Sequence, residues 1–407
     1  MSTDAIIGDL MTETGRGNPY PLYAKLHEIG PVSASAGNPN FFVVNGYREA
    51  NAVLRNPGFG RWDEQPQPGT EWAGHASLTS LNHSLLDLNP PDHTRIRRLM
   101  SAVFTPRRTA ALAPAIESSV QALLDAMADN GTADRPVDFM DEFAFRVPVA
   151  VICELLGVPE ADRYRFRALA WDLGIALELI DDPAKLAPAD EATVQLHEYF
   201  SALAAERRAE PRDDLTSALV QEADEADGSL SEEELLSNLT LLLLAGFETT
   251  TNLFGNGLAL LFERPGLAAA VRAGTAPVTD FVEEVLRFDS PVQLTSRVAR
   301  AEGLDVAGIP VPLGAEVLVL LGAANRDPAR FRDPGVFDWT RPDNQPLSFG
   351  AGGHYCLGAA LARLEATTAF PMLLRRFPAL APAEGVQRIR SDRLVLRGFR
   401  TLPVTVT

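Results

Sequence analysis

The stretch between Ser231 and Pro265 constrains the fold most, because it contains no helix breaker. It opens with Ser231-Glu232-Glu233-Glu234, which has the pattern of a capping box, and Leu230 and Leu235 are placed to form a hydrophobic staple. A helix of some 30 residues would be about 45 Å long, enough to cross a whole domain. Few globular proteins contain a helix of this length.

The remainder of the chain is predicted to be mainly α-helical, with a small β-sheet region. Long segments rich in Ala, Leu, Glu and Arg predict helices over 110–129, 139–156, 192–208 and 268–287. Short apolar segments bounded by Gly, Pro and Asn predict strands over Pro31–Ala36 and Phe41–Val44 and short strands around Val306–Ile309 and Glu316–Leu321. No linker or repeat interrupts the sequence, so we expect one domain over residues 1–407.

Composition excludes several classes of partner. The formal net charge of −18 disfavours nucleic acid and anionic membrane surfaces. The longest apolar run, Leu239 to Phe247, is shorter than the roughly 20 residues of a membrane span, and the N-terminus lacks the pattern of a signal peptide. We therefore expect a cytoplasmic protein without a membrane anchor.

Cys356, one of only two cysteines, lies in an unusual setting. It follows the glycine-rich segment Phe349-Gly350-Ala351-Gly352-Gly353-His354-Tyr355, and a predicted helix begins just after Gly358. Backbone N–H groups and the helix dipole stabilise a thiolate at such a position, which is the form that binds a metal. Cys153, in contrast, lies in an apolar helical segment and is predicted to be a buried structural thiol.

Two other interpretations of this segment are possible. The cysteine could be inert in an ordinary loop, or the glycines could belong to a dinucleotide-binding fingerprint. The second fails, because Gly350–Tyr355 lacks the last glycine of G-x-G-x-x-G and no βαβ pattern surrounds it.

The segment Phe349–Gly358 resembles the haem-binding signature F-G-x-G-x-H-x-C-x-G of the cytochrome P-450 family at every fixed position. The resemblance implies that Cys356 is the axial ligand of a haem b iron and that His354 contacts a haem propionate. It makes Phe349, Gly350 and Gly358 part of the cofactor-binding loop. The implied fold is a large helical domain with a small sheet region, in which haem is buried between the long helix and the cysteine loop.

The long helix contains a second match. Ala245-Gly246-Phe247-Glu248-Thr249-Thr250 resembles the family's oxygen-activation motif A-G-x-[D/E]-T-T. Ala245 and Thr249 share a helix face, and the resemblance implies that Gly246 helps to leave a groove for dioxygen. Thr249 and Glu248 would deliver protons. Alternatively, Thr249 only bonds back to a carbonyl one turn earlier and bends the helix.

Two more matches occur in the order that the family requires. His93 and Arg97 resemble the H-x-x-x-R pair that binds haem propionates in bacterial members, and Arg297 matches a third propionate-binding position. Glu284-Val285-Leu286-Arg287 resembles the E-x-x-R motif, with Arg341 as its third partner. On an isolated helix, Glu and Arg three residues apart are usually a surface pair, but the resemblance implies a structural network.

The resemblance, which covers nearly the whole chain, implies a monooxygenase that uses dioxygen and obtains electrons from NAD(P)H through ferredoxin reductase and ferredoxin. Thiolate ligation favours O–O cleavage. A peroxide-driven haem enzyme and a non-catalytic haem sensor are the alternatives; neither needs Glu248 with Thr249. We expect a monomer.

The substrate pocket is predicted to be apolar, with Phe247, Val292, Leu294 and Phe399 near the iron. A medium or large hydrophobic natural product from secondary metabolism, such as a polyketide, macrolide or peptide in antibiotic biosynthesis, fits this lining. Between Asp92 and Arg108 the sequence carries five arginines and a single acid. Apart from Arg97, these arginines (Arg95, Arg98, Arg107 and Arg108) predict a basic island that docks an acidic ferredoxin.

Overall fold

A computed structural model of the protein describes residues 1–62, 69–102, 104–132, 134–224 and 230–406. The chain folds into two compact units, each built from separate segments of the sequence. Unit 1 comprises Met1–Arg61, Leu124–Ala144 and Asn252–Thr407, and unit 2 comprises Trp62–Leu123 and Phe145–Thr251. The boundaries between segments fall within helix α8 (Ala113–Asn130) and helix α13 (Glu232–Phe262), among other places.

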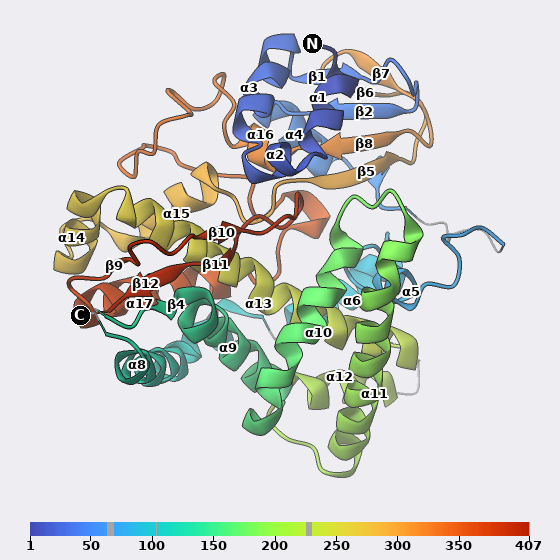
Figure 1. Ribbon diagram of the computed structural model, residues 1–407. Helices are drawn as coiled ribbons and strands as arrows, with labels where there is room; N and C mark the ends of the chain where they lie inside the picture. Colours follow the sequence, from blue (N-terminus) through green and yellow to red (C-terminus); the bar gives the residue numbers. More distant parts are fainter. Residues whose placement is uncertain (63–68, 103, 133, 225–229, 407) are drawn as a thin grey trace. The chain divides into compact units, whose positions relative to one another are not determined.

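Unit 1 contains a five-stranded sheet whose strand order is β1-β2-β8-β5-β3 (Figure 1). Strands from the start of the chain lie in it beside strands from residues 295–319, and β2 runs parallel to β8 while the other pairs are antiparallel. Apolar side chains such as Val44, Val317 and Val319 are fully buried there. The strands are β1 (Val32–Ala34), β2 (Phe41–Val44), β3 (Phe59–Gly60), β5 (Thr295–Ala299) and β8 (Glu316–Val319).

The helices of unit 1 come from both ends of the chain. They are α1 (Thr3–Leu10), α2 (Glu13–Gly17), α3 (Tyr20–Ile29), α4 (Tyr47–Arg55), α14 (Pro265–Ala273), α15 (Val278–Phe288), α16 (Leu321–Ala324) and α17 (Ala359–Arg376), with the short turns η1 (Met140–Ala144) and η5 (Gly352–His354). Three small sheets complete the unit: β4 (Val137–Asp138) with β12 (Pro403–Thr405) and β9 (Ala381–Pro382), β10 (Ile389–Arg390) with β11 (Phe399–Thr401), and β6 (Leu304–Val306) with β7 (Ile309–Val311).

Unit 2, in the part of it that the structure describes, is helical. Its helices are α5 (Ala76–Asn82), α6 (Asp92–Ser101), α7 (Pro106–Ala111), α9 (Arg146–Leu156), α10 (Phe166–Leu173), α11 (Ala187–Ala209) and α12 (Leu215–Asp224), with the turns η2 (Glu160–Arg165), η3 (Gly174–Leu177) and η4 (Pro183–Leu186). The prediction of a mainly α-helical chain with a small sheet region is confirmed.

The predicted long helix is present as α13, with 31 residues. Its capping box is formed in both directions. The backbone N–H of Glu234 donates to Ser231 Oγ at 3.1 Å, and the N–H of Ser231 donates to Glu234 Oε2 at 2.8 Å. Leu230 and Leu235, the predicted staple residues, are both buried.

One predicted element is wrong in detail. The helix expected over 268–287 is two helices, because Gly274 ends α14 at a φ of +71° and Pro277 precedes α15. Local turn geometry outweighs the helical pattern there. The short strands expected around Val306–Ile309 are present as the hairpin of β6 and β7, which turns at Ala307 and Gly308 with φ angles of +53° and +78°.

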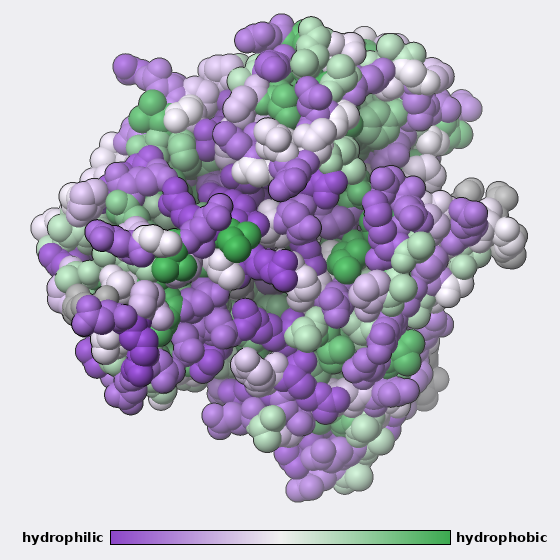
Figure 2. Space-filling model, in the orientation of Figure 1, coloured by the Kyte–Doolittle hydropathy of each residue, from purple (hydrophilic) through white to green (hydrophobic). Residues whose placement is uncertain are grey.

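No helix within the described ranges is both long and apolar enough to cross a membrane. Hydrophobic residues on the face in Figure 2 are scattered among hydrophilic ones, as expected for a chain with 54 acidic and 36 basic residues.

Candidate active site

The cysteine loop of unit 1 depends on glycine at two positions. Gly350 and Gly352 have φ angles of +66° and +70°, where other residues are strained. A Cβ atom on Gly352 would lie 2.1 Å from the carbonyl oxygen of Leu54 in α4, so the loop packs directly on that helix. The backbone N–H of Cys356 donates to the Phe349 carbonyl at 2.9 Å. The loop therefore holds the cysteine in a defined place two residues before Gly358, the N-cap of α17.

The Cys356 side chain is exposed, whereas Cys153 is fully buried in α9. Burial raises the pKa of the Cys153 thiol to about 12, so this cysteine is protonated at neutral pH. An exposed thiol at the N-terminus of an 18-residue helix is suited to bind a metal as the thiolate. The two cysteines thus lie in the two environments that the sequence predicted.

Arg363 of α17 supports the cysteine loop and was missed by sequence reasoning. Its guanidinium lies 4.4 Å from the centre of the Phe349 ring and donates to Glu283 of α15, with an Nη2–Oε2 distance of 3.1 Å. Burial opposes its charge, but the hydrogen-bonded pair with Glu283 raises the pKa of Arg363 above its ordinary value. The sequence signal was the acid doublet Glu283-Glu284, in which only Glu284 belongs to the motif.

The network predicted around Glu284 is confirmed. Arg287 donates to both carboxylate oxygens of Glu284 at 2.7 and 2.8 Å, and both side chains are fully buried. Arg341 Nε lies 3.6 Å from Glu284 Oε2, and the backbone N–H of Asp338 donates to Glu284 Oε1 at 2.7 Å. Arg287 also donates to the carbonyls of Asn325, Pro334 and Val336. The network fixes the segment that precedes the cysteine loop.

Helix α13 opens to solvent at the turn that carries the predicted oxygen-activation motif. Leu241–Leu244 are buried, but Ala245 is exposed and Thr249, on the same face, is half-buried. The Thr249 hydroxyl donates to the Ala245 carbonyl at 3.1 Å. Next to it, the Glu248 side chain is buried, with 6% of its surface exposed. The back-bonded threonine of the alternative interpretation is therefore present, and it occurs where the helix has an open face.

Gly246 and Phe247 lie away from this open face. A Cβ atom on Gly246 would lie 2.6 Å from Ile152 Cγ1, so the glycine permits close packing of α13 on α9. Phe247 is buried against Phe145, with ring centres 5.3 Å apart. The structure does not bring this predicted pocket residue to the face of Ala245 and Thr249.

The predicted propionate-binding residues occupy several elements. His93 and Arg97 share one face of α6 in unit 2, and His93 is 4% exposed. Arg297 of β5 in unit 1 is also 4% exposed and donates to the Ser296 carbonyl at 2.7 Å. His354 ends the turn η5 of the cysteine loop and is partly buried.

One member of the predicted basic island is neutralised. Arg95 donates to Glu234 at 2.6 Å and to Asp92 at 2.9 Å, so its charge is paired within unit 2. Arg98, Arg107 and Arg108 are exposed, and they remain as the island.

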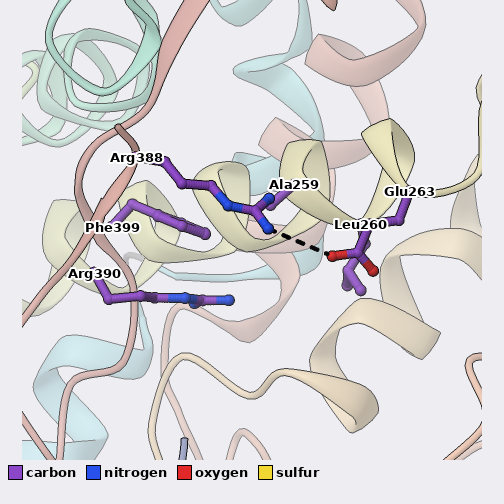
Figure 3. A pocket seen from close by; sticks show the side chains of 6 residues that line it. All are labelled: Ala259, Leu260, Glu263, Arg388, Arg390 and Phe399. Atoms are coloured by element: carbon purple, nitrogen blue, oxygen red, sulfur yellow. Dashed lines mark ion pairs between the residues drawn. The ribbon is translucent and has the colours of Figure 1, made fainter. Parts of the chain in front are cut away.

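The other predicted pocket residues lie in unit 1. Val292 forms an isolated antiparallel β-bridge with Leu396, and Leu294, two residues later in the chain, is buried. The Arg390 guanidinium stacks on the Phe399 ring, with its carbon 3.8 Å from the ring centre, in a pocket with Ala259, Leu260, Glu263 and Arg388 (Figure 3). The lining of this pocket includes the charged side chains of Glu263, Arg388 and Arg390.

Comparison with known proteins identifies the family. The family model "Cytochrome P450" matches residues 6–276 and 277–403. The chain belongs to the cytochrome P450 family. It is 40% identical to the cytochrome P450 monooxygenase PikC of Streptomyces venezuelae over 95% of this chain and 91% of that protein. It is 39% identical to the 6-deoxyerythronolide B hydroxylase of Saccharopolyspora erythraea, over 98% of both chains.

Solved structures agree with this assignment. P450BioI, crystallised in complex with an acyl carrier protein ligated to hexadec-9Z-enoic acid, matches with a TM-score of 0.89 and 35% identity over 97% of this chain and 99% of that one. CYP164A2 of Mycobacterium smegmatis matches with a TM-score of 0.87 and 36% identity, over 99% and 100%. The protein is thus a P450 oxidoreductase whose cofactor is haem b, and the cytochrome P450 fold expected from the sequence is confirmed.

Proposed function

We propose that this P450 inserts one oxygen atom of dioxygen into, or oxidatively couples, a medium-to-large hydrophobic natural product, such as a polyketide, macrolide or peptide of secondary metabolism. The names of the two relatives, a P450 monooxygenase and a hydroxylase of 6-deoxyerythronolide B, support this class of reaction. The open face of α13 at Ala245 and Thr249 carries the proposal, because it presents the Thr249 hydroxyl in the middle of a long helix, one residue from the buried Glu248 side chain.

The residues present fit a haem-thiolate cofactor. The exposed Cys356 thiol, held by a glycine cradle at a helix N-terminus, would bind the haem iron as its thiolate. His93, Arg97, Arg297 and His354 supply donors suited to carboxylates and are assigned to the propionates. When bound, the haem supplies the iron at which dioxygen is activated.

Thr249 and Glu248 are assigned to proton delivery. The Thr249 hydroxyl is oriented by the Ala245 carbonyl, so its oxygen can accept a hydrogen bond on the open face. The Glu248 carboxylate is buried one residue away and can pass protons to that hydroxyl. Electrons are proposed to come from NAD(P)H through a separate ferredoxin reductase and ferredoxin.

The test of the axial ligand compares the two cysteines. Reduced wild-type protein under carbon monoxide should show the strongly red-shifted Soret band of thiolate-ligated haem. Cys356→Ala should lose that band and Cys153→Ala should keep it, because the Cys153 thiol is buried and protonated. Retention of the band in Cys356→Ala would overturn the assignment.

The test of the reaction uses the same purified protein with a surrogate ferredoxin and reductase. Spin-state titration against a panel of macrolactones, peptides and fatty acids should select a large hydrophobic compound, and its addition should raise NAD(P)H consumption. Product formed equally well with peroxide alone would instead indicate a peroxide-driven enzyme. Binding without any turnover would indicate a sensor.

A further inference from the structure

Two arginines of unit 1 lie opposite each other at the edge of the main sheet. Strand β3 pairs antiparallel with β5, with Phe59 opposite Ala299 and Gly60 opposite Val298. The same register places the next residue, Arg61, opposite Arg297. Sequence reasoning assigned a function to Arg297 and none to Arg61.

The two guanidinium groups converge on the same two oxygen atoms. Arg61 Nη1 donates to Thr295 Oγ1 at 3.2 Å and to the Ser296 carbonyl at 2.9 Å. Arg297 Nη1 donates to the same atoms at 3.1 and 2.7 Å. The two cations therefore lie side by side, although like charges on directly opposite strand residues repel each other.

An anion placed beside two converging guanidinium groups is attracted by both charges. A carboxylate suits the position, because each of its oxygens can accept hydrogen bonds from one planar guanidinium. Arg297 is 4% exposed and Arg61 is partly buried, so such hydrogen bonds would be shielded from water and strengthened.

We propose that Arg61 is a further cofactor-binding residue, which grips one haem propionate together with Arg297. This inference rests on the proposed role of Arg297 and adds a second guanidinium from a different strand. Strand β3, which directly precedes Arg61, would thereby be linked to the cofactor.

The test measures how fast haem leaves the protein. Holoenzyme is mixed with excess apomyoglobin, and haem transfer is followed by absorbance. Arg61→Gln should lose haem about tenfold faster than wild type, because a charge-assisted hydrogen bond is removed. Arg61→Lys keeps the charge but not the planar guanidinium, so its rate of haem loss should lie between those of the wild type and Arg61→Gln. Arg48→Gln, which removes an exposed arginine from α4 of the same unit, should change the rate less than twofold. Equal rates for Arg61→Gln and Arg48→Gln would overturn the proposal.

A second arm identifies the group that Arg61 contacts. Wild type and Arg61→Gln are each reconstituted with iron protoporphyrin IX dimethyl ester, whose propionates carry no charge. The difference in haem loss between them should shrink to less than twofold. If the full tenfold difference persisted with the ester, Arg61 would act on the fold and not on a propionate.

The other source of a carboxylate is an acidic substrate. Dodecanoic acid and its methyl ester are titrated by spin state into both proteins. Arg61→Gln should leave the ratio of the two affinities within twofold. A selective loss of affinity for the acid, with unchanged haem loss, would overturn the proposal in favour of a substrate-binding arginine. The haem-loss assay does not depend on the carbon monoxide spectrum. Absence of the thiolate band would therefore refute the proposed function without deciding the role of Arg61.

Discussion

At the scale of single residues, the motif on α13 combines groups that face in different directions. Ala245 and Thr249 form the open face, whereas Gly246 and Phe247 pack within unit 2. A motif that reads as one unit in the sequence therefore divides into a chemical part and a packing part. These parts can be separated by mutation.

The chemical part is tested at Thr249. Thr249→Ala removes the hydroxyl but leaves the helix, so we expect haem and substrate binding to be retained while most of the reductant is diverted to peroxide. Product and hydrogen peroxide per NADH oxidised are measured together. Thr249→Ser keeps the hydroxyl and should restore at least half of the coupling. Full coupling in Thr249→Ala would show that this threonine is structural.

The packing part is tested at Gly246. A Cβ atom there would lie 2.6 Å from Ile152 Cγ1, so Gly246→Ala should lower the free energy of unfolding by about 1–3 kcal/mol through overpacking. In the background of Ile152→Ala, the same substitution should cost much less. Gly266→Ala in α14, where a Cβ atom meets nothing within 4 Å, is the control and should be neutral or slightly stabilising. Equal costs for Gly246→Ala in both backgrounds would contradict this account.

At the scale of elements, α5 and α11 of unit 2 are joined by two histidines whose pKa values shift in opposite directions. His75 Nδ1 lies 2.6 Å from Asp190 Oδ2, and this hydrogen bond raises the pKa of His75. His197 Nε2 lies 3.0 Å from Ser80 Oγ, and burial lowers the pKa of His197 although Glu233 opposes the shift. The junction thus favours one protonated and one neutral imidazole.

The signs of these shifts predict a pH optimum for the junction. The contribution of His75 is fully present below the unfolded pKa of about 6.5 and is lost as pH rises through its higher folded value. For His197, the neutral form is favoured, so stability is lost as pH falls below about 6.5. The free energy of unfolding of the wild type minus that of His75→Gln should fall as pH rises above about 6.5. The same difference taken with His197→Gln should rise from acid pH toward neutrality. A difference that does not change between pH 5 and 8.5 for either variant would contradict the assignment.

Elements were predicted from sequence where a periodic pattern was long or a capping signal was specific. The start of α13 is an example, because Ser231 and Glu234 satisfy each other's backbone groups without help from distant residues. The division of 268–287 was not predicted, since the helical pattern continues through Gly274 and only the positive φ ends the helix. Arg61 and Arg363 were missed for a different reason. Their partners, Ser296 and Glu283, lie 235 and 80 residues away in the chain and become neighbours only through the fold.

At the scale of the whole molecule, a protein of net charge −18 carries three exposed arginines on α6 and α7. Exposed charges affect mainly the rate of association and are screened beyond about 8 Å at physiological salt. Arg98→Glu with Arg108→Glu should therefore slow reduction by ferredoxin several-fold and weaken its dependence on salt, while substrate affinity changes little.

Stopped-flow reduction at several ionic strengths measures this effect. Lys25→Glu with Arg48→Glu changes the net charge equally at exposed positions of α3 and α4, and it controls for the total charge. If the two double variants behaved alike, ferredoxin would not dock on the island formed by Arg98, Arg107 and Arg108.

The contact between Gly352 and α4 also bears on how the protein is made. Unit 2 has all of its residues once Thr251 has been synthesised, whereas β2 must wait for β8, which lies some 275 residues later. At roughly 5–20 residues per second, the ribosome leaves the β2 edge without its partner for on the order of tens of seconds. During that interval the unpaired edge of the N-terminal strands is exposed to aggregation. In the proposed assignment, Cys356 becomes available to haem only after the cysteine loop has been synthesised and has settled on a helix made about 300 residues earlier.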